Sequence, residues 1–159
     1  MSRHALIVPV PELGPVVEPW LERSARSKPS HGVPAHVTLL FPCPGDAEAI
    51  RDVLEPFAGF EVEFRETRRF PDVLYLAPEP GRPFVEMTEA LVARFPEWPP
   101  YEGRFDEIVP HLSIAAGDAV GEAEADLAPR LPLRDCAREA VLLREAAPER
   151  WVPAAGFPL

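Results

Sequence analysis

The amino-acid sequence predicts an α+β fold in which antiparallel sheets are flanked by helices. Segments with strand patterns come in pairs, whereas a doubly wound parallel sheet needs strands and helices that alternate. The two halves of the chain also look like rough repeats, because each contains strands, helices and one His-apolar-hydroxyl-apolar segment. With 159 residues and 47% hydrophobic side chains, residues 1–159 are expected to form a single domain with a sizeable core.

The first elements of the chain are a strand and a helix. Residues 4–10 predict a strand, which the turn Pro9-Val10-Pro11 closes. Apolar residues at helical spacing predict a helix over residues 15–23, and we expect Pro19 to fall within its first turn. Residues 24–32 are polar and predict a loop.

The middle of the chain predicts a strand, a helix and a strand pair. The strand over residues 36–42 ends at a proline, and Asp46 then offers an N-cap for a helix over residues 47–57. Residues 60–65 alternate cleanly between apolar and polar side chains, which is typical of a half-buried strand. A second strand over residues 73–76 completes the pair.

The second half repeats this order. Residues 84–95 predict an amphipathic helix, and residues 96–103 predict a loop rich in proline and aromatic side chains. Residues 105–110 lead into another strand, and residues 119–131 predict a helix rich in Ala and Glu. The closing elements are one or two strands over residues 133–137 and 140–144 and an extended segment over residues 151–159, interrupted by prolines.

Two segments share one pattern, and each reads His-apolar-hydroxyl-apolar. Side chains of a strand alternate between its faces, so the imidazole and the hydroxyl of each segment share a face while the apolar residues point into a core. Ser and Thr occupy only eight positions, yet two of the four histidines have one of them two residues later. The segments are Pro34-Ala35-His36-Val37-Thr38-Leu39 and Pro110-His111-Leu112-Ser113-Ile114.

These side chains suit the cleavage of a phosphodiester. The reaction needs a base that takes a proton from the nucleophile and an acid that protonates the leaving oxygen on the opposite side. Because the pKa of histidine lies near neutrality, His36 and His111 are candidates for this acid–base pair. The hydroxyls of Thr38 and Ser113 are candidates for binding the phosphate oxygens.

Three other interpretations of the pattern remain open. The groove can be a binding module that captures a nucleotide or an RNA end without turnover. It can hold a metal, although zinc usually takes three or four ligands and neither segment offers Cys, Asp or Glu at its inward positions. The histidines can also be core residues that bond to neighbouring hydroxyls in a protein that works elsewhere.

The charge and the cysteines narrow the functional classes. A net charge of −10 and a pI near 4.9 exclude the basic surface of a long nucleic-acid binder, but they allow a small nucleotide or RNA terminus in one pocket. Cys43 and Cys136 have no metal or redox spacing, so we expect reduced thiols and a cytoplasmic protein. The apolar run over residues 5–8 is too short for a signal peptide or a membrane span.

Further polar residues are candidates for contacts with a ligand. The guanidinium group of arginine can bind phosphate through two hydrogen bonds, and tyrosine can stack on a base. Arg68, Arg69 and Tyr75 are therefore candidates, although surface charge and core packing explain these residues as well. The loops over residues 24–32 and 96–103 are candidate lids, and the first of these holds Arg26, Lys28 and His31. His4 is expected to be a polar residue at a strand edge.

The paired segments resemble the His-x-Thr/Ser-x signatures of the two-histidine phosphoesterase superfamily, which includes the bacterial 2′-5′ RNA ligase-like proteins and cyclic phosphodiesterases. The resemblance extends over nearly the whole chain. It implies a bilobal fold, with two pseudo-symmetric lobes that each have an antiparallel sheet and flanking helices, and with the active site in the groove between them.

By the same resemblance, His36 and His111 would be the catalytic acid and base, and Thr38 and Ser113 would bind the phosphate. The implied reaction opens 2′,3′-cyclic phosphates, usually to 2′-phosphomonoesters, or acts on 2′-5′ linkages, with no metal and no cofactor. Ser113 stands where the signature has Thr and keeps the hydroxyl. We expect a monomer, and the sequence leaves open which histidine is the acid.

Overall fold

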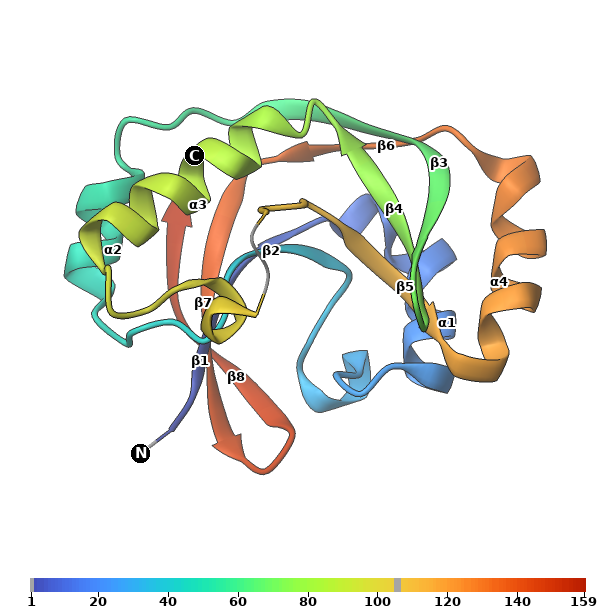
Figure 1. Cartoon of the computed structure of the whole chain (residues 1–159), viewed down its shortest axis with the longest axis horizontal. Helices are drawn as coiled ribbons and strands as arrows, with labels where there is room; N and C mark the ends of the chain where they lie inside the picture. The colour runs from blue at the N-terminus through green and yellow to red at the C-terminus, as the bar shows by residue number, and fades with distance from the viewer. Residues whose placement is uncertain (1, 105–106) are drawn as a thin grey trace.

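The computed structural model describes residues 2–104 and 107–159, and the strands of these residues form one antiparallel sheet (Figure 1). Neighbouring strands follow the order β6-β3-β4-β5-β2-β1-β7-β8. The predicted α+β class is confirmed. The strands are β1 (His4–Pro9), β2 (His36–Leu40), β3 (Phe60–Phe70), β4 (Val73–Glu79), β5 (Leu112–Ala116), β6 (Leu133–Ala137), β7 (Glu139–Ala147) and β8 (Arg150–Pro158).

The helices lie close to their predicted positions. Asp46 caps α2 as expected, because its Oδ1 accepts a hydrogen bond from the amide of Ala49 at 3.1 Å. Part of the predicted lead-in to β5, residues 105 and 106, lies outside the described residues. The helices are α1 (Gly14–Ser24), α2 (Ala47–Leu54), α3 (Arg82–Arg94) and α4 (Val120–Leu127), and the 3-10 turns used below are η1 (Pro11–Leu13), η2 (Pro29–His31) and η3 (Pro100–Gly103).

Pro19 lies deeper in its helix than the sequence predicts. Helix α1 begins at Gly14, so Pro19 falls in the second turn, and the expectation that it lies in the first turn is wrong. Pro19 has no N–H to donate to the carbonyl of Pro15. Both prolines are exposed, and water can therefore satisfy that carbonyl.

The sheet has two halves that meet at a narrow junction. One half is β6-β3-β4-β5 and the other is β2-β1-β7-β8. Strands β2 and β5 join them through the single register pair Val37↔Leu112. The predicted division into two lobes, each with its own sheet, is not confirmed, since the strands form one continuous sheet.

Two helices pack against the half of the sheet that does not contain the strand preceding them in the chain. Helix α1 follows β1 but packs against β5, and α3 follows β4 but packs against β2. Helix α2 also packs against α3 and β8, whereas α4 packs against β4 and β5. Figure 1 accordingly shows α2 and α3 at one end of the molecule and α1 and α4 at the other.

The C-terminal segment forms a longer strand than its prolines suggest. Strand β8 runs through Pro153 and Pro158 and pairs with β7 alone, at the edge of the sheet. An edge strand tolerates proline because only one of its sides needs to complete a hydrogen-bonded ladder. Strand β3 likewise extends to Phe70, five residues past its predicted end at residue 65.

The two faces of the sheet bury different clusters. The main core lies between one face and the helices and includes Leu6, Val37 and Leu112, each 0% exposed. Ile7, which follows Leu6 in β1, belongs to a smaller cluster. This cluster also contains Leu143 of β7, Val33 and Trp151. Because neighbouring residues of a strand point to opposite faces, this second cluster lies on the face away from the main core.

Candidate active site

Strand β2 presents His36 and Thr38 on the face away from the main core. Val37 and Leu39, which alternate with them, are buried in that core. Thr38 is paired with Ile7 of β1, and cross-strand partners share a face. The predicted orientation of this motif is therefore confirmed.

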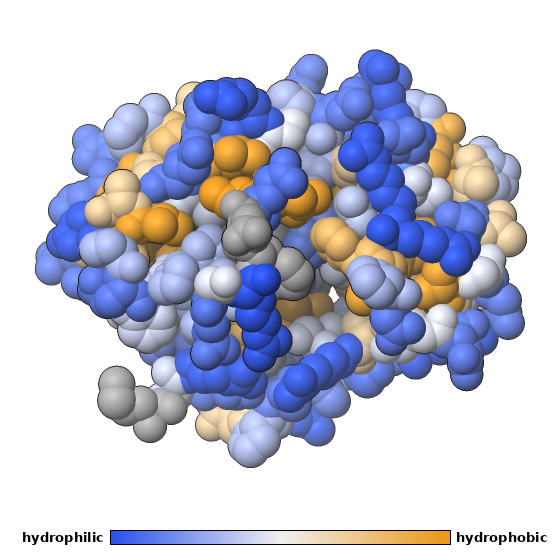
Figure 2. Space-filling model, in the orientation of Figure 1, coloured by the Kyte–Doolittle hydropathy of each residue, from blue (hydrophilic) through white to orange (hydrophobic). Residues whose placement is uncertain are grey.

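The second motif lies beside the first. Because Val37 is paired with Leu112 in an antiparallel register, one further residue on either side places His36 opposite Ser113 and Thr38 opposite His111. Side chains in such opposite positions have Cβ atoms about 5 Å apart. The structure thus brings the four predicted residues together where the two motif strands lie side by side. Figure 2 shows a hollow near the middle of the molecule, between its two ends.

Both imidazole rings are held in the same way. Nδ1 of His36 lies 2.7 Å from the carbonyl oxygen of Pro34, and Nδ1 of His111 lies 2.8 Å from that of Val109. A carbonyl oxygen only accepts, so each Nδ1 must carry the hydrogen. The Nε2 atom of each neutral ring is therefore an acceptor, and that of His36 accepts from Thr38 Oγ1 at 3.1 Å.

Burial makes both rings harder to charge. It is the main cause that lowers the pKa of His36 and of His111 below the ordinary value of 6.5. The carbonyls of Pro34 and Val109 act in the opposite direction, and the nearby charge of His111 lowers the pKa of His36 further. A neutral ring suits a base, while a ring that acts as an acid needs support for its charge.

Aromatic side chains enclose His111. Its ring meets Phe70 edge-on at a centroid distance of 5.1 Å and Tyr75 at 5.7 Å. Phe70 and Tyr75 also stack on each other at 4.3 Å. Tyr75, one of the predicted ligand candidates, is 6% exposed, so it supports the His111 ring rather than offering an open stacking surface.

Tyr101 is a site residue that the sequence does not single out, although it lies in a predicted lid loop. Its hydroxyl is hydrogen-bonded to Thr38, and burial raises its pKa above the ordinary value of 10.0. Its ring lies 6.4 Å from that of His111. Tyr101 and Glu102 have φ angles of 50° and 57°, a left-handed backbone that residues other than glycine rarely adopt. The aromatic-rich composition of the loop was the available signal.

The sheet separates the two candidate arginines. Arg68 is paired with Tyr75, which is paired with Ser113, so these side chains form one row on the face of the histidines. Arg69 points to the opposite face and binds Glu124 of α4 at 2.7 Å. Arg68 binds the exposed Glu66 at 2.6 Å, a surface pair that a ligand can displace.

The loop over residues 24–32 forms one wall of a small cavity. Two of its basic side chains are bonded elsewhere: Arg26 binds Glu149, and Lys28 donates to the carbonyl of Glu22. Its Ser27 instead lines the cavity. The cavity measures about 110 Å³ and is lined by Ala5, Ile7, Ser27, Val33, His36, Thr38, Phe41, Tyr101, Leu143 and Trp151.

Gly32 lets this loop approach strand β8. Its φ angle is 96°, and a Cβ atom at this position would collide with the carbonyl oxygen of Trp151. The close approach brings Val33 and Trp151 into one apolar cluster beside His36. The loop over residues 24–32, a candidate lid, therefore forms part of the wall of the cavity.

Other chemically notable residues lie apart from this site. The His4 ring packs against Gly45, where a Cβ atom would lie 2.7 Å from its Cε1. Cys43 and Cys136 are free, and burial raises the pKa of Cys43 to about 12. Among residues 2–104 and 107–159, no group of three or more His, Cys, Asp or Glu side chains is placed to hold a metal ion. No helix in these ranges is long and apolar enough to cross a membrane.

An α+β fold with an antiparallel sheet, in which two His-hydroxyl motifs lie side by side, is the arrangement expected of a two-histidine phosphoesterase. The chain belongs to the 2′-5′ RNA ligase superfamily, whose family model matches residues 9–149. The resemblance stated for the two motifs is thereby confirmed at the level of the family.

Solved structures share the fold. Escherichia coli LigT in complex with 3′-AMP is 16% identical, with a TM-score of 0.65 and coverage of 99% of this chain and 98% of that chain. The protein TT0787 of Thermus thermophilus is 23% identical, with a TM-score of 0.64 and coverage of 99% and 97%. A structure described as a phosphoesterase is 18% identical, with a TM-score of 0.61 and coverage of 100% and 99%. No similar sequence was found among curated proteins.

Proposed function

We propose that this protein is a metal-independent phosphodiesterase that opens the 2′,3′-cyclic phosphates of nucleotides or RNA ends, or acts on 2′-5′ linkages. His36 and His111 are the acid–base pair, and Thr38 and Ser113 bind the phosphate. One imidazole takes a proton from water as its oxygen attacks phosphorus. The bond from phosphorus to O3′ then breaks, and the other imidazole gives its proton to that oxygen. The product is a 2′-phosphomonoester.

This proposal rests on the equivalent hydrogen bonds that hold the two imidazole rings. Because Nδ1 of each ring donates to a backbone carbonyl, Nε2 of each is the atom left for proton transfer. By the register Val37↔Leu112, His36 and His111 are diagonal neighbours across the two strands, and such residues are typically about 7–8 Å apart. A phosphate group fits between rings at such a spacing, with the hydroxyls beside it.

A small substrate suits the surroundings of the site. The adjoining cavity of about 110 Å³ accepts only a small group, and the net charge of −10 opposes a long phosphate backbone. LigT from E. coli has been solved with 3′-AMP and with NADP+, both of which are nucleotides. These observations favour a nucleotide or a short RNA terminus as the substrate.

The test is hydrolysis of the four nucleoside 2′,3′-cyclic phosphates with a chelator present. We expect turnover by the wild type and a fall in kcat of about 10²- to 10⁴-fold in both His36→Ala and His111→Ala, because each variant lacks one proton-transfer group. His4→Ala is the matched control, since His4 is a strand histidine that packs against Gly45 instead.

The other outcomes distinguish the alternatives. Full activity in both active-site variants would refute the assignment of the histidines. Tight binding of the nucleotide without product would favour the binding module. Activity that the chelator abolishes and an added metal restores would favour a metal site. The isomer of the product identifies which bond to phosphorus breaks.

A further inference from the structure

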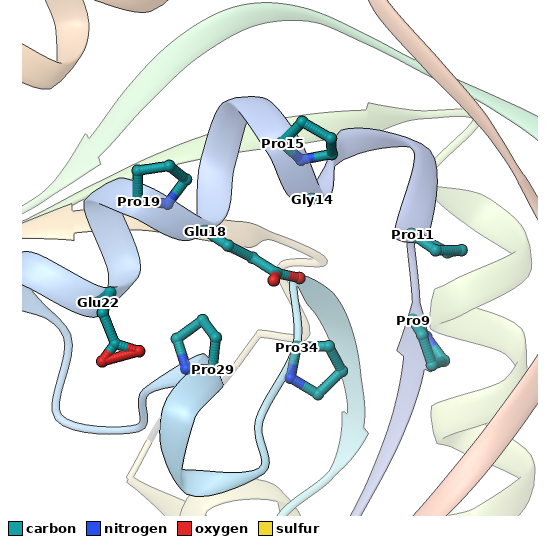
Figure 3. A pocket seen from close by; sticks show the side chains of 9 residues that line it. All are labelled: Pro9, Pro11, Gly14, Pro15, Glu18, Pro19, Glu22, Pro29 and Pro34. Carbon is teal, nitrogen blue, oxygen red and sulfur yellow. The ribbon is translucent and has the colours of Figure 1, made fainter.

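A single peptide group lies between a carboxylate and His36. Oε2 of Glu18, on helix α1, accepts a hydrogen bond from the amide of Ala35 at 3.0 Å. The carbonyl of Pro34, which belongs to the same peptide group, accepts the Nδ1–H of His36 at 2.7 Å. Figure 3 shows the side chain of Glu18 reaching from α1 toward the segment that contains Pro34.

The geometry of a peptide group connects these two hydrogen bonds. A trans peptide is planar, and its N–H and C=O point in opposite directions. A carboxylate that fixes the direction of the Ala35 N–H therefore also fixes the direction of the Pro34 carbonyl. Hydrogen bonds in a chain polarise one another, so a negative charge on one side makes the carbonyl oxygen on the other side a stronger acceptor.

We propose that Glu18 is a positioning residue for His36, which acts through the Pro34–Ala35 peptide to orient the imidazole and to stabilise its positively charged form. This inference rests on the proposed function for its catalytic meaning. The support is needed because burial opposes a charge on this ring. When Nε2 takes a proton, the positive charge is shared with Nδ1–H, which faces the polarised carbonyl.

The second motif has no equivalent of this arrangement. The carbonyl of Val109 accepts the Nδ1–H of His111, but the nitrogen of that peptide group belongs to Pro110. Proline has no N–H, so no carboxylate can be attached there in the same way. The two motifs look equivalent in sequence, and this peptide distinguishes them.

The surroundings of Glu18 favour this role. A Cβ atom at Gly14 would lie 3.2 Å from Glu18 Oε2, so glycine leaves room for the carboxylate. The groups that face His36 from packed elements are His111, whose charge lowers the pKa of His36, and Tyr101, which reaches it through Thr38. Figure 3 shows Glu22 one turn further along α1. Glu22 binds the amide and the hydroxyl of Ser30 and makes no bond to the Pro34–Ala35 peptide among its described contacts.

The test is an NMR titration of the His36 and His111 rings in the full chain, without substrate. Glu18→Gln keeps an oxygen that accepts from Ala35 but removes the charge, and we expect the pKa of His36 to fall by about 0.5 to 1. Glu18→Asp keeps the charge but is too short to reach the amide, and the pKa of His36 should fall here too. Glu22→Gln is the matched control and should leave it unchanged.

Several results would overturn the proposal. An unchanged pKa of His36 in Glu18→Gln would overturn it, as would an equal fall in the pKa of His111. A Glu18→Asp variant that behaves like the wild type would mean that the charge acts through space rather than through the peptide. Since the titration uses no substrate, it stays informative even if the wild type hydrolyses none of the cyclic phosphates.

Activity supplies the second measurement. We expect kcat to fall about 3- to 10-fold in Glu18→Gln with KM unchanged, and one limb of the pH profile to move. If His36 is the base, the lower pKa moves the acid limb to lower pH, and if it is the acid, the alkaline limb moves to lower pH. The moving limb therefore identifies the role of His36, and a profile in which neither limb moves contradicts the proposal.

Discussion

At the scale of single residues, the alternation of a strand decides which of two neighbours can meet a substrate. Arg68 and Arg69 are adjacent in sequence and chemically identical, yet Arg68 lies in a row with Tyr75 and Ser113 while Arg69 binds Glu124 on the helix side. Only Arg68 shares the face of the sheet on which the histidines lie. The strand register shows that the two arginines lie on opposite faces, which the amino-acid composition cannot show.

This difference predicts distinct effects of two matched substitutions. Arg68→Gln should raise KM for a cyclic phosphate roughly 3- to 10-fold, because it removes a charge-assisted hydrogen bond that is partly screened at an exposed position. Arg69→Gln should leave KM unchanged and lower the free energy of unfolding by less than about 1 kcal/mol. Steady-state kinetics and denaturant unfolding of both variants check this, and equal KM values in the two would contradict it.

The residues of the two motifs could be predicted from sequence, and two of their neighbours, Glu18 and Tyr101, could not. Period-two alternation places His36 beside Thr38 on one face whatever the rest of the chain does. Glu18 and Tyr101 join the site through contacts with Ala35 and Thr38, which depend on how distant segments pack. No local pattern encodes those contacts.

At the scale of elements, helix α1 connects the two motif strands. Its last residue, Ser24, accepts a hydrogen bond from the amide of Ala116 in β5 at 3.1 Å, and Glu18 holds the residue before His36 of β2. The chain positions α1 from its N-terminal side through η1. There the buried carboxylate of Asp135 in β6 accepts from the amide of Glu12 at 2.9 Å.

We expect Asp135→Ala to lower the free energy of unfolding by about 2 to 3 kcal/mol, because it removes the acceptor of two part-buried hydrogen bonds, from the amides of Glu12 and Cys136. Asp135→Asn keeps one carbonyl oxygen and should cost less. Urea unfolding monitored by circular dichroism measures both. If alanine costs no more than asparagine, the carboxylate does not hold η1.

The boundaries of elements were less predictable than their existence. The sequence predicts α1, but its start at Gly14 puts Pro19 in the second turn, where exposure lets water replace the missing hydrogen bond. Strand β8 continues through its prolines because it lies at an edge. In both cases tertiary position decides what a proline does, and sequence alone does not supply that position.

At the scale of the whole molecule, the crossing helices bind the two halves of the sheet to each other. Each half receives one helix that follows a strand of the other half, α1 on β5 and α3 on β2. Each half is therefore covered in part by a helix that follows a strand of the other half. The sequence reveals the rough repeat but not this exchange, which follows from long-range packing.

We propose that residues 1–159 unfold as one cooperative unit. Trp20 reports on the end of the molecule with α1 and α4, where it donates to Asp126, and Trp151 reports on β8, in the other half of the sheet. Trp98 should first be replaced by Phe. Variants that then retain only Trp20 or only Trp151 should each unfold at the same denaturant midpoint in fluorescence as in circular dichroism. Two separate midpoints would show that the halves unfold independently.

The position of β8 at the edge of the sheet bears on how the protein behaves when concentrated. An exposed edge is a template on which a second chain can build a ladder. Two of the nine residues of β8, Pro153 and Pro158, have no N–H to offer such a ladder. The prolines that interrupt the sequence pattern therefore make this edge a poor template for a second chain, and the net charge of −10 adds repulsion between molecules.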